Sequence, residues 1–265
     1  MRLLFSRQWW WTTLLVIAAL GVMVRLGIWQ LDRLQQRRTF NARVSVQLAQ
    51  PLLVLDSETL GADLANMEYR SVMVKGEYDP SQEAALSNQV WNSQPGVHLL
   101  TPLRISGSDQ AVLVDRGWIP LVEAAPERWG KFTEPGLVEV RGVIRTSQHR
   151  PRFGGLPDTT QAPGQGRVTS WNRVNLARLA EQTPYPLLPI YIQQAPDPSW
   201  TTLPYRSQPE LDLSEGPHLG YAVQWFLFAS VLAIGYPFFV RHSTLPHTAR
   251  PPAAQRTPPP PSGWA

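Results

Sequence analysis

The sequence predicts an α+β membrane protein in which two transmembrane helices flank a mainly-β, barrel- or sandwich-like extramembrane domain with a few helices. Charged residues make up only 17% of the 265 residues, and an apolar run lies near each end of the chain. Each run has about 20 residues, the length that a helix needs to cross a bilayer. Between the runs, short segments rich in Val, Ile, Leu, Tyr and Trp are bounded by Gly, Pro, Asn and Asp, which is typical of strands joined by turns.

The first span is expected at residues 9–30, after a cytoplasmic N-terminus at residues 1–8. It opens with three tryptophans, whose rings favour the membrane interface. Arg2 and Arg7 would also suit a cleavable secretory signal. The apolar run is longer than a usual signal core, however, and no small-x-small cleavage pattern precedes Arg25 and the arginines after it. We therefore expect an uncleaved anchor.

A helical extension is predicted at residues 31–50, followed by the extramembrane domain at residues 51–216. Six strands are expected in the domain, at residues 69–78, 96–105, 110–119, 137–145, 167–174 and 188–194. The turn signal "SGSD" predicts that the second and third of these strands form a hairpin. The segment "NLARLAEQ", which has a capping asparagine and ends before a proline, predicts a short helix at residues 175–182.

The second span is expected at residues 217–240, where only Gln224 and Ser230 are clearly polar. A proline-rich tail follows at residues 241–265, and we expect it to be disordered and cytoplasmic. With two spans, the end of the first and the start of the second must lie on the same side of the membrane. The charges that flank the second span place the C-terminus inside, whereas those that flank the first favour the opposite orientation.

Composition excludes several classes of function. The net charge is +4, but the arginines gather beside the spans rather than on a nucleic-acid-binding face. The chain contains no cysteine, which excludes disulfides and thiolate sites for zinc or copper. No nucleophile with a matching base and no glycine-rich phosphate loop can be identified, so an enzyme is not expected. Asp115 and Arg116 are interpreted as an ion pair at the end of a strand.

His218 is the first candidate for a binding residue. It shares a helical face with Tyr221, Ala222 and Trp225, which follow at spacings of three, four and seven residues. Two interpretations are open on spacing alone. The imidazole can present an axial ligand to a haem that lies against the helix, or it can cap the helix or anchor it among the lipid headgroups.

A second set of candidate binding residues lies at the end of the first span and in the helix that continues from it. Its members, in chain order, are Arg25, Trp29, Gln30, Arg33, Leu34, Arg37 and Arg38. Long side chains that extend to the interface would explain this pattern. Alternatively, the guanidinium groups are placed to pair with the carboxylates of a bound ligand.

Five segments in order resemble the surfeit-locus family of cytochrome c oxidase assembly factors. They are "LGIWQLDRLQQRR" (26–38), "YRSVMVKGEYDP" (69–80), "GVHLLTPLRI" (96–105), "VLVDRGWIP" (112–120) and "PHLGYAVQWF" (217–226). Each motif is weak alone, but the ordered set is specific and covers nearly the whole chain up to about residue 242. A bacterial member is expected. The family often has two asparagines before the histidine, where this chain has Gly216 and Pro217.

The resemblance implies a multi-pass protein of the bacterial inner membrane, with a periplasmic central domain and both termini cytoplasmic. It also implies binding of haem a at the outer membrane interface and help with its insertion into the oxidase catalytic subunit. The expected partners are that subunit and the enzymes of haem a synthesis. The alternative function is a haem-free membrane scaffold that stabilises an oxidase subunit during assembly.

The same resemblance assigns roles to individual residues. His218 matches the histidine regarded as a haem ligand in the family and is expected to coordinate the iron. Arg33 and Arg37 are expected to meet the haem propionates. The remaining expected binding residues are Gln30 and the aromatic residues Trp29, Tyr221 and Trp225.

Overall fold

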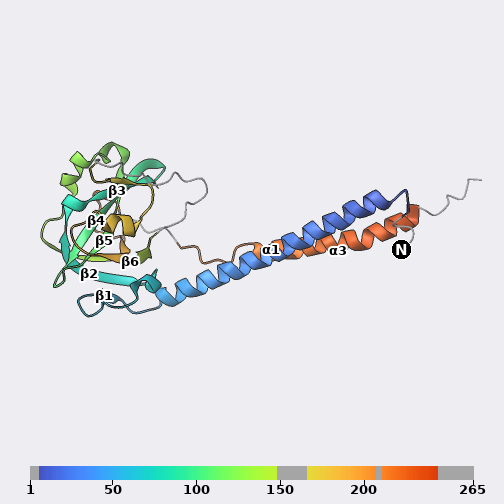
Figure 1. Cartoon of the computed structure of the whole chain (residues 1–265), viewed down its shortest axis with the longest axis horizontal. Helices are drawn as coiled ribbons and strands as arrows, with labels where there is room; N and C mark the ends of the chain where they lie inside the picture. The colour runs from blue at the N-terminus through green and yellow to red at the C-terminus, as the bar shows by residue number, and fades with distance from the viewer. Residues whose placement is uncertain (1–5, 148–165, 207–210, 244–265) are drawn as a thin grey trace, which may run out of the picture. The chain divides into compact units, whose positions relative to one another are not determined.

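The computed structural model describes residues 6–147, 166–206 and 211–243 (Figure 1). It divides into a helical unit, Met1–Arg38 with Glu215–Ala265, and a second unit, Thr39–Ser214. Two long apolar helices flank a β domain with few helices, so the predicted fold class is confirmed. The disordered tail predicted at residues 241–265 begins too early, because residues 241–243 belong to α3. The rest of the predicted tail lies outside the described residues.

The two long helices are α1, Trp10–Leu48, and α3, His218–Ser243. Both are long and apolar enough to cross a membrane. Only 6% of the most apolar window of α1 and 11% of that of α3 is buried inside the protein. A core helix of a soluble protein would be mostly buried, so these exposed apolar surfaces are suited to lipid. As predicted, the helix of the first span continues towards Pro51.

The helices α1 and α3 run side by side in opposite directions (Figure 1). At one end, Thr13 Oγ1 lies 2.7 Å from Tyr236 Oη. Further along, a Cβ added to Gly27 would lie 2.7 Å from the ring of Phe226, so the missing side chain lets the helices approach closely. Small residues and hydrogen bonds between helices are the usual means of packing inside a membrane, where hydrophobic burial provides no driving force.

The β domain contains eight strands within the described residues. They are β1 (Leu53–Leu55), β2 (Ser71–Tyr78), β3 (Ala84–Trp91), β4 (Gln94–Ile105), β5 (Ala111–Pro120), β6 (Leu137–Thr146), β7 (Ser170–Trp171) and β8 (Leu187–Gln194). The short helix α2 covers Leu176–Ala180, and the 3-10 helices η1 to η4 cover Leu64–Met67, Pro80–Gln82, Leu121–Glu123 and Pro126–Phe132.

Five of the strands close into a barrel. The order β2–β6–β8–β5–β4 returns to β2 through the antiparallel pairing of β2 with β4. The long strand β4 makes closure possible, because its end at Leu103–Ile105 pairs with β2 and its start pairs with β3. A barrel leaves few unpaired strand edges. The structure therefore decides between the two predicted architectures in favour of the barrel.

Three apolar clusters support this sheet. The barrel interior is filled by side chains such as Val72, Leu103 and Ile192, all of which are fully buried. A second cluster forms where α2 packs on the sheet around Trp171. A third forms where η4 covers β4 and β5. Helices α2 and η4 thus each bury an apolar face against the sheet.

Most of the predicted elements are confirmed. The predictions at residues 69–78, 96–105, 110–119, 137–145 and 188–194 correspond to β2, β4, β5, β6 and β8, and β4 with β5 form the predicted antiparallel hairpin. The predicted helix at residues 175–182 is α2, whose N-cap Asn175 accepts a hydrogen bond from Arg178 N. The prediction at residues 167–174 was too long, because only Ser170–Trp171 forms a strand. Strands β1 and β3 were not predicted.

The interpretation of Asp115 and Arg116 as an ion pair was wrong. The two residues have different partners, and the pairing of β4 with β5 skips Arg116, because Leu100 lies opposite Asp115 and Leu99 lies opposite Gly117. Asp115 lies 2.9 Å from His98 Nδ1. Arg116, which is 1% exposed, lies 3.0 Å from Glu83 and 2.9 Å from Glu134.

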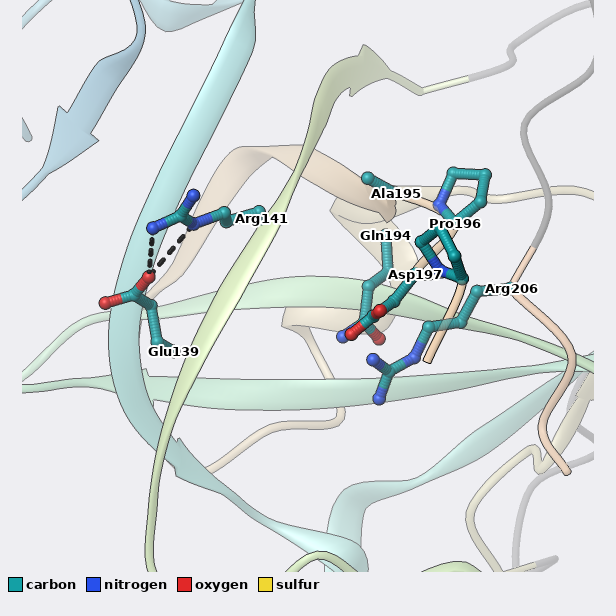
Figure 2. Close-up of a pocket in the computed structure, with 8 residues that line it drawn as sticks. Glu139, Arg141, Gln194, Ala195, Pro196, Asp197 and Arg206 are labelled. Carbon is teal, nitrogen blue, oxygen red and sulfur yellow. Dashed lines mark hydrogen bonds and ion pairs between the residues drawn. The ribbon is translucent and has the colours of Figure 1, made fainter. Parts of the chain in front are cut away.

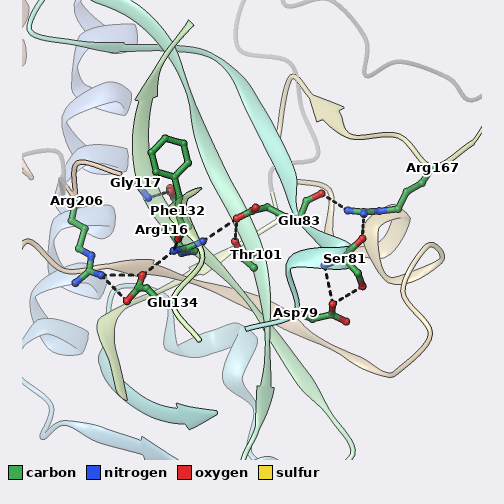
Figure 3. Close-up of polar contacts among 11 residues, drawn as sticks. Asp79, Ser81, Glu83, Thr101, Arg116, Gly117, Phe132, Glu134, Arg167 and Arg206 are labelled. Atoms are coloured by element: carbon green, nitrogen blue, oxygen red, sulfur yellow. Dashed lines mark hydrogen bonds and ion pairs between the residues drawn. The ribbon is translucent and has the colours of Figure 1, made fainter. Parts of the chain in front are cut away.

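Arg116 is the centre of a buried polar network (Figure 3). Its guanidinium also donates to Phe132 O and lies over the ring of Tyr78, 4.7 Å from the ring centroid. Thr101 donates to the same Glu83 oxygen as Arg116. Burial still raises the pKa of Glu83, even though Thr101 and Arg116 both favour its ionised form. The network holds the bend between β2 and β3 against β5.

Candidate functional site

His218 is the first residue of α3, and the backbone before it has a special conformation. Gly216 has φ +68°, in the left-handed region. Glycine adopts this region freely, and asparagine is among the few other residues that tolerate it. Gly216 therefore fits a position where the family pattern has asparagine. Pro217 contributes its carbonyl to the first helical hydrogen bond, from Tyr221 N, but it has no side chain that can cap the helix.

The side chain of His218 is held by α1. Its Nδ1 lies 2.9 Å from Gln30 Oε1. An amide oxygen only accepts hydrogen bonds, so Nδ1 carries the hydrogen and donates it. In neutral imidazole this leaves the lone pair on Nε2, the atom that can then bind a metal.

The His218–Gln30 pair lies at one end of the apolar helix pair. Gln30 follows Trp10 by about 20 residues, which corresponds to about 30 Å of helix, the thickness of a bilayer core. At the other end, the rings of Trp9 and Phe239 meet edge to face at 5.8 Å. A bilayer that covered the apolar part of α1 would therefore have this polar pair at its edge.

An ion pair beside this site was not predicted from the sequence. Arg38 Nε and Nη2 each lie 2.8 Å from one carboxylate oxygen of Glu215. This two-point contact fixes the segment just before Gly216 to α1. The only signal in the sequence was an acidic residue before the second span and an arginine after the first, and 177 residues separate them.

The other predicted residues do not all converge on His218. Arg33 lies over the ring of Trp29, 5.6 Å from its centroid, and donates to Gln36 at 3.0 Å. Trp29 and Tyr221 are 41% and 49% exposed, which leaves both rings available to a ligand or to lipid.

Two predicted residues remain to be placed. Trp225 packs edge to face on Phe228 at 6.3 Å, and Arg37 is half-buried on α1. Among the expected binding residues, the structure thus brings together His218 with Gln30 and Arg33 with Trp29.

The residues at this site fit a haem held by one axial ligand. Histidines that bind metals usually donate the other ring N–H to an oxygen, and Gln30 supplies that oxygen. No group of three or more metal-binding side chains occurs among the described residues. His218 and His242 are the described histidines of the helical unit, and they lie at opposite ends of α3.

Two further histidines, His98 and His149, belong to the other unit of the chain. His98 is held by Asp115 in the β domain, and His149 lies outside the described residues.

Comparison with known proteins identifies related chains. The model of the SURF1 family matches residues 17–230, which include most of α1, the whole β domain and the first half of α3. A "SURF1-like protein" of Monosiga brevicollis is 25% identical over 243 residues, and the match covers 88% of each chain. A second, of Caenorhabditis briggsae, is 24% identical, and the match covers 84% of this chain and 74% of the relative.

A mammalian relative is similar to the same extent. "Surfeit locus protein 1" of Mus musculus is 24% identical over 235 residues, and the match covers 83% of this chain and 73% of the relative.

Proposed function

Because this chain belongs to the SURF1 family, we propose that it assists the assembly of haem–copper cytochrome c oxidase. In this proposal it binds haem a at the outer membrane interface and passes it to the catalytic subunit. In the same proposal it acts in a bacterial inner membrane, with the β domain in the periplasm and both termini in the cytoplasm. It carries out no chemical reaction of its own.

The observation that supports this proposal best is the hydrogen bond between His218 Nδ1 and Gln30 Oε1, 2.9 Å long. It directs the free Nε2 of His218 while fixing the plane of the ring. A histidine that served only as a headgroup anchor would not need a partner on the other span. An oriented imidazole at the end of two apolar helices suits a hydrophobic cofactor whose iron needs a nitrogen ligand.

Other residues of the helical unit provide contacts of two kinds. The exposed rings of Trp29 and Tyr221 offer apolar surface to a macrocycle. Arg33, whose guanidinium lies over Trp29, can pair with a propionate at the edge of that surface. A haem would bring its redox-active iron to the oxidase, and the residues named here would hold it until it is released.

The proposal is tested by the absorption spectrum of the full-length protein, purified after co-expression with the enzymes of haem a synthesis. Wild-type protein should carry haem a, quantified as the pyridine haemochrome. His218→Ala should lose the Soret band or shift it strongly. His242→Ala is the matched control, because it removes the histidine at the other end of the same helix and should leave the spectrum unchanged.

Gln30→Leu extends the test to the contact that orients the ring. It keeps His218 but removes the acceptor for Nδ1, and loss of such a partner typically weakens metal binding about 10- to 100-fold. A colourless wild-type protein, or a spectrum unchanged in His218→Ala, would contradict the proposal. A colourless protein that still supports oxidase assembly would be a scaffold.

A further inference from the structure

The β domain contains a pocket whose lining residues all belong to that domain. Its volume is about 400 Å³, within the range of ligand-binding pockets. It is lined by Glu139 and Arg141 of β6, by Gln194 at the end of β8, by the following residues Ala195, Pro196, Asp197 and Pro198, and by Arg206. Figure 2 shows Gln194, Asp197 and Arg206 gathered on one side, with Glu139 and Arg141 reaching towards each other on the other side.

The pocket lies where a strand leaves the barrel. Strand β2 pairs with β6 as far as Leu137, whereas the pairing of β8 with β6 ends at Gly142. The last contact on the β8 side is the hydrogen bond from Ala195 N to Arg141 O, 2.8 Å long. Beyond it, Pro196 and Pro198 have no N–H with which the departing chain could continue the ladder.

One side of β6 therefore has main-chain groups that β8 does not reach. Backbone groups of an antiparallel strand alternate between its two neighbours. Ile144 exchanges hydrogen bonds with the residues that lead into β2, and Arg141 O is directed to the β8 side. By this alternation Glu139 presents its N–H and C=O to the β8 side, at the pocket.

Two buried side-chain atoms of the pocket also need partners. Gln194 is 6% exposed, and its Oε1 has no hydrogen-bond partner among the described residues. The same holds for Arg206 Nε, although the other end of that guanidinium lies 3.4 Å from Glu134. The pocket thus offers one acceptor and one donor, the complement of a peptide group.

The charges of the lining restrict the occupant. Two carboxylates, Glu139 and Asp197, face two guanidinium groups, Arg141 and Arg206. Arg141 is already paired with Glu139 at 2.8 Å. A strongly charged ligand of either sign would be repelled by two side chains of its own sign. The uncharged amides of a polypeptide would not be repelled by either pair.

We infer that this pocket binds an extended segment of a partner protein, which adds a strand to the free side of β6. The segment exchanges main-chain hydrogen bonds with Glu139 and donates an N–H to Gln194 Oε1. Strand addition is a common mode of peptide recognition, in which the backbone provides the affinity. This inference does not depend on haem binding, and it can be tested with haem-free protein.

The test begins with full-length protein in lipid nanodiscs and a phage-displayed library of 12-residue peptides, counter-selected on empty nanodiscs. The affinity of the selected peptides is measured by fluorescence anisotropy. Glu139→Pro removes the N–H that faces the pocket together with the carboxylate, and it leaves the hydrogen bonds to β2 in place, since this residue donates away from β2. It should weaken binding at least tenfold. Glu139→Ala is the matched control, because it removes the carboxylate but keeps the N–H, and it should bind within about threefold of wild type.

The same contact can be removed from the peptide. Methylation of the peptide nitrogens that face β6 should abolish binding, while methylation of the intervening nitrogens should not. If Glu139→Pro fails to fold, this comparison of methylated peptides tests strand addition by itself. The inference is overturned if no peptide is enriched over empty nanodiscs. It is equally overturned if Glu139→Pro folds and binds like wild type, or if the position of methylation makes no difference.

Discussion

His98 and Asp115 form a buried pair whose charge depends on pH. Their side chains are 12% and 6% exposed, and His98 Nδ1 lies within 3.0 Å of both carboxylate oxygens. Burial lowers the pKa of His98, but the charge and hydrogen bond of Asp115 outweigh burial and leave the pKa raised. Charged His98 is therefore favoured in the folded protein.

Stability should decrease as the pH rises through the raised pKa of His98. The stabilisation from this pair is fully present below the pKa of an unfolded histidine, about 6.5, and it is lost above the folded value. The melting temperature of wild-type protein should therefore fall, relative to that of His98→Gln, when the pH is raised from about 6 to 9. Parallel pH curves for the two proteins would show that the pair contributes nothing.

Arg116 should be far more important for stability than an exposed arginine. Arg116→Met leaves Glu83 as an unpaired buried charge, and breaking such a pair typically costs about 3–5 kcal/mol. The control Arg141→Met breaks the exposed pair with Glu139, which is worth about 0–1 kcal/mol. Denaturant unfolding compares the two, and equal losses would contradict the structural role of the network.

At the scale of single residues, the sequence indicated which residues matter better than it indicated their hydrogen-bond partners. His218 and Gln30 were both singled out from spacing and polarity. Their hydrogen bond was not, because spacing within a helix carries no information about which residue of another helix lies opposite. The partners of Asp115 and Arg116 were missed for the same reason, since the strand pairing that brings His98 to Asp115 depends on register.

Among the elements, the contact between α1 and α3 depends on one glycine. A side chain at Gly27 would collide with Phe226, whereas Gly21 of the same helix has open space around it. Gly27→Leu should separate the helices and lower the melting temperature in detergent by several degrees, because membrane helices rely on close packing. Gly21→Leu is the same substitution on the same helix at a position with no atom within 4 Å of the added Cβ, and it should leave the melting temperature nearly unchanged. Similar values for the two variants would show that this contact is dispensable.

Strands with a clear apolar run in the sequence were predictable, whereas strands and pairings that depend on contacts with distant parts of the chain were not. Strands β2, β4, β5, β6 and β8 have apolar runs bounded by turn residues. Strand β3 has a polar centre, a positive φ at Asn88 and a register shift after Leu86, so it shows no alternation. Barrel closure rests on a pairing of three residues between β2 and β4, and no local pattern reveals such a contact.

For the molecule as a whole, the expected topology can be measured directly, because the chain has no cysteine. A membrane-impermeant maleimide applied to spheroplasts should label Asp109→Cys, which lies in the exposed turn between β4 and β5. Ser6→Cys, before α1, should be labelled only after the membrane is permeabilised. The reverse pattern would place the β domain in the cytoplasm and exclude binding at the outer interface.

The bond between Gln30 and His218 also determines when the site comes into existence. The two residues are 188 positions apart, so synthesis at roughly 5–20 residues per second separates their emergence by roughly 10–40 s. Throughout that interval α1 is a lone span and Gln30 has no imidazole to orient. The oriented histidine appears only when α3 has been inserted beside α1, after the intervening β domain has been made. Under the proposed function, a partly synthesised molecule therefore has no oriented ligand for haem, and the binding site is complete only when both helices have been inserted.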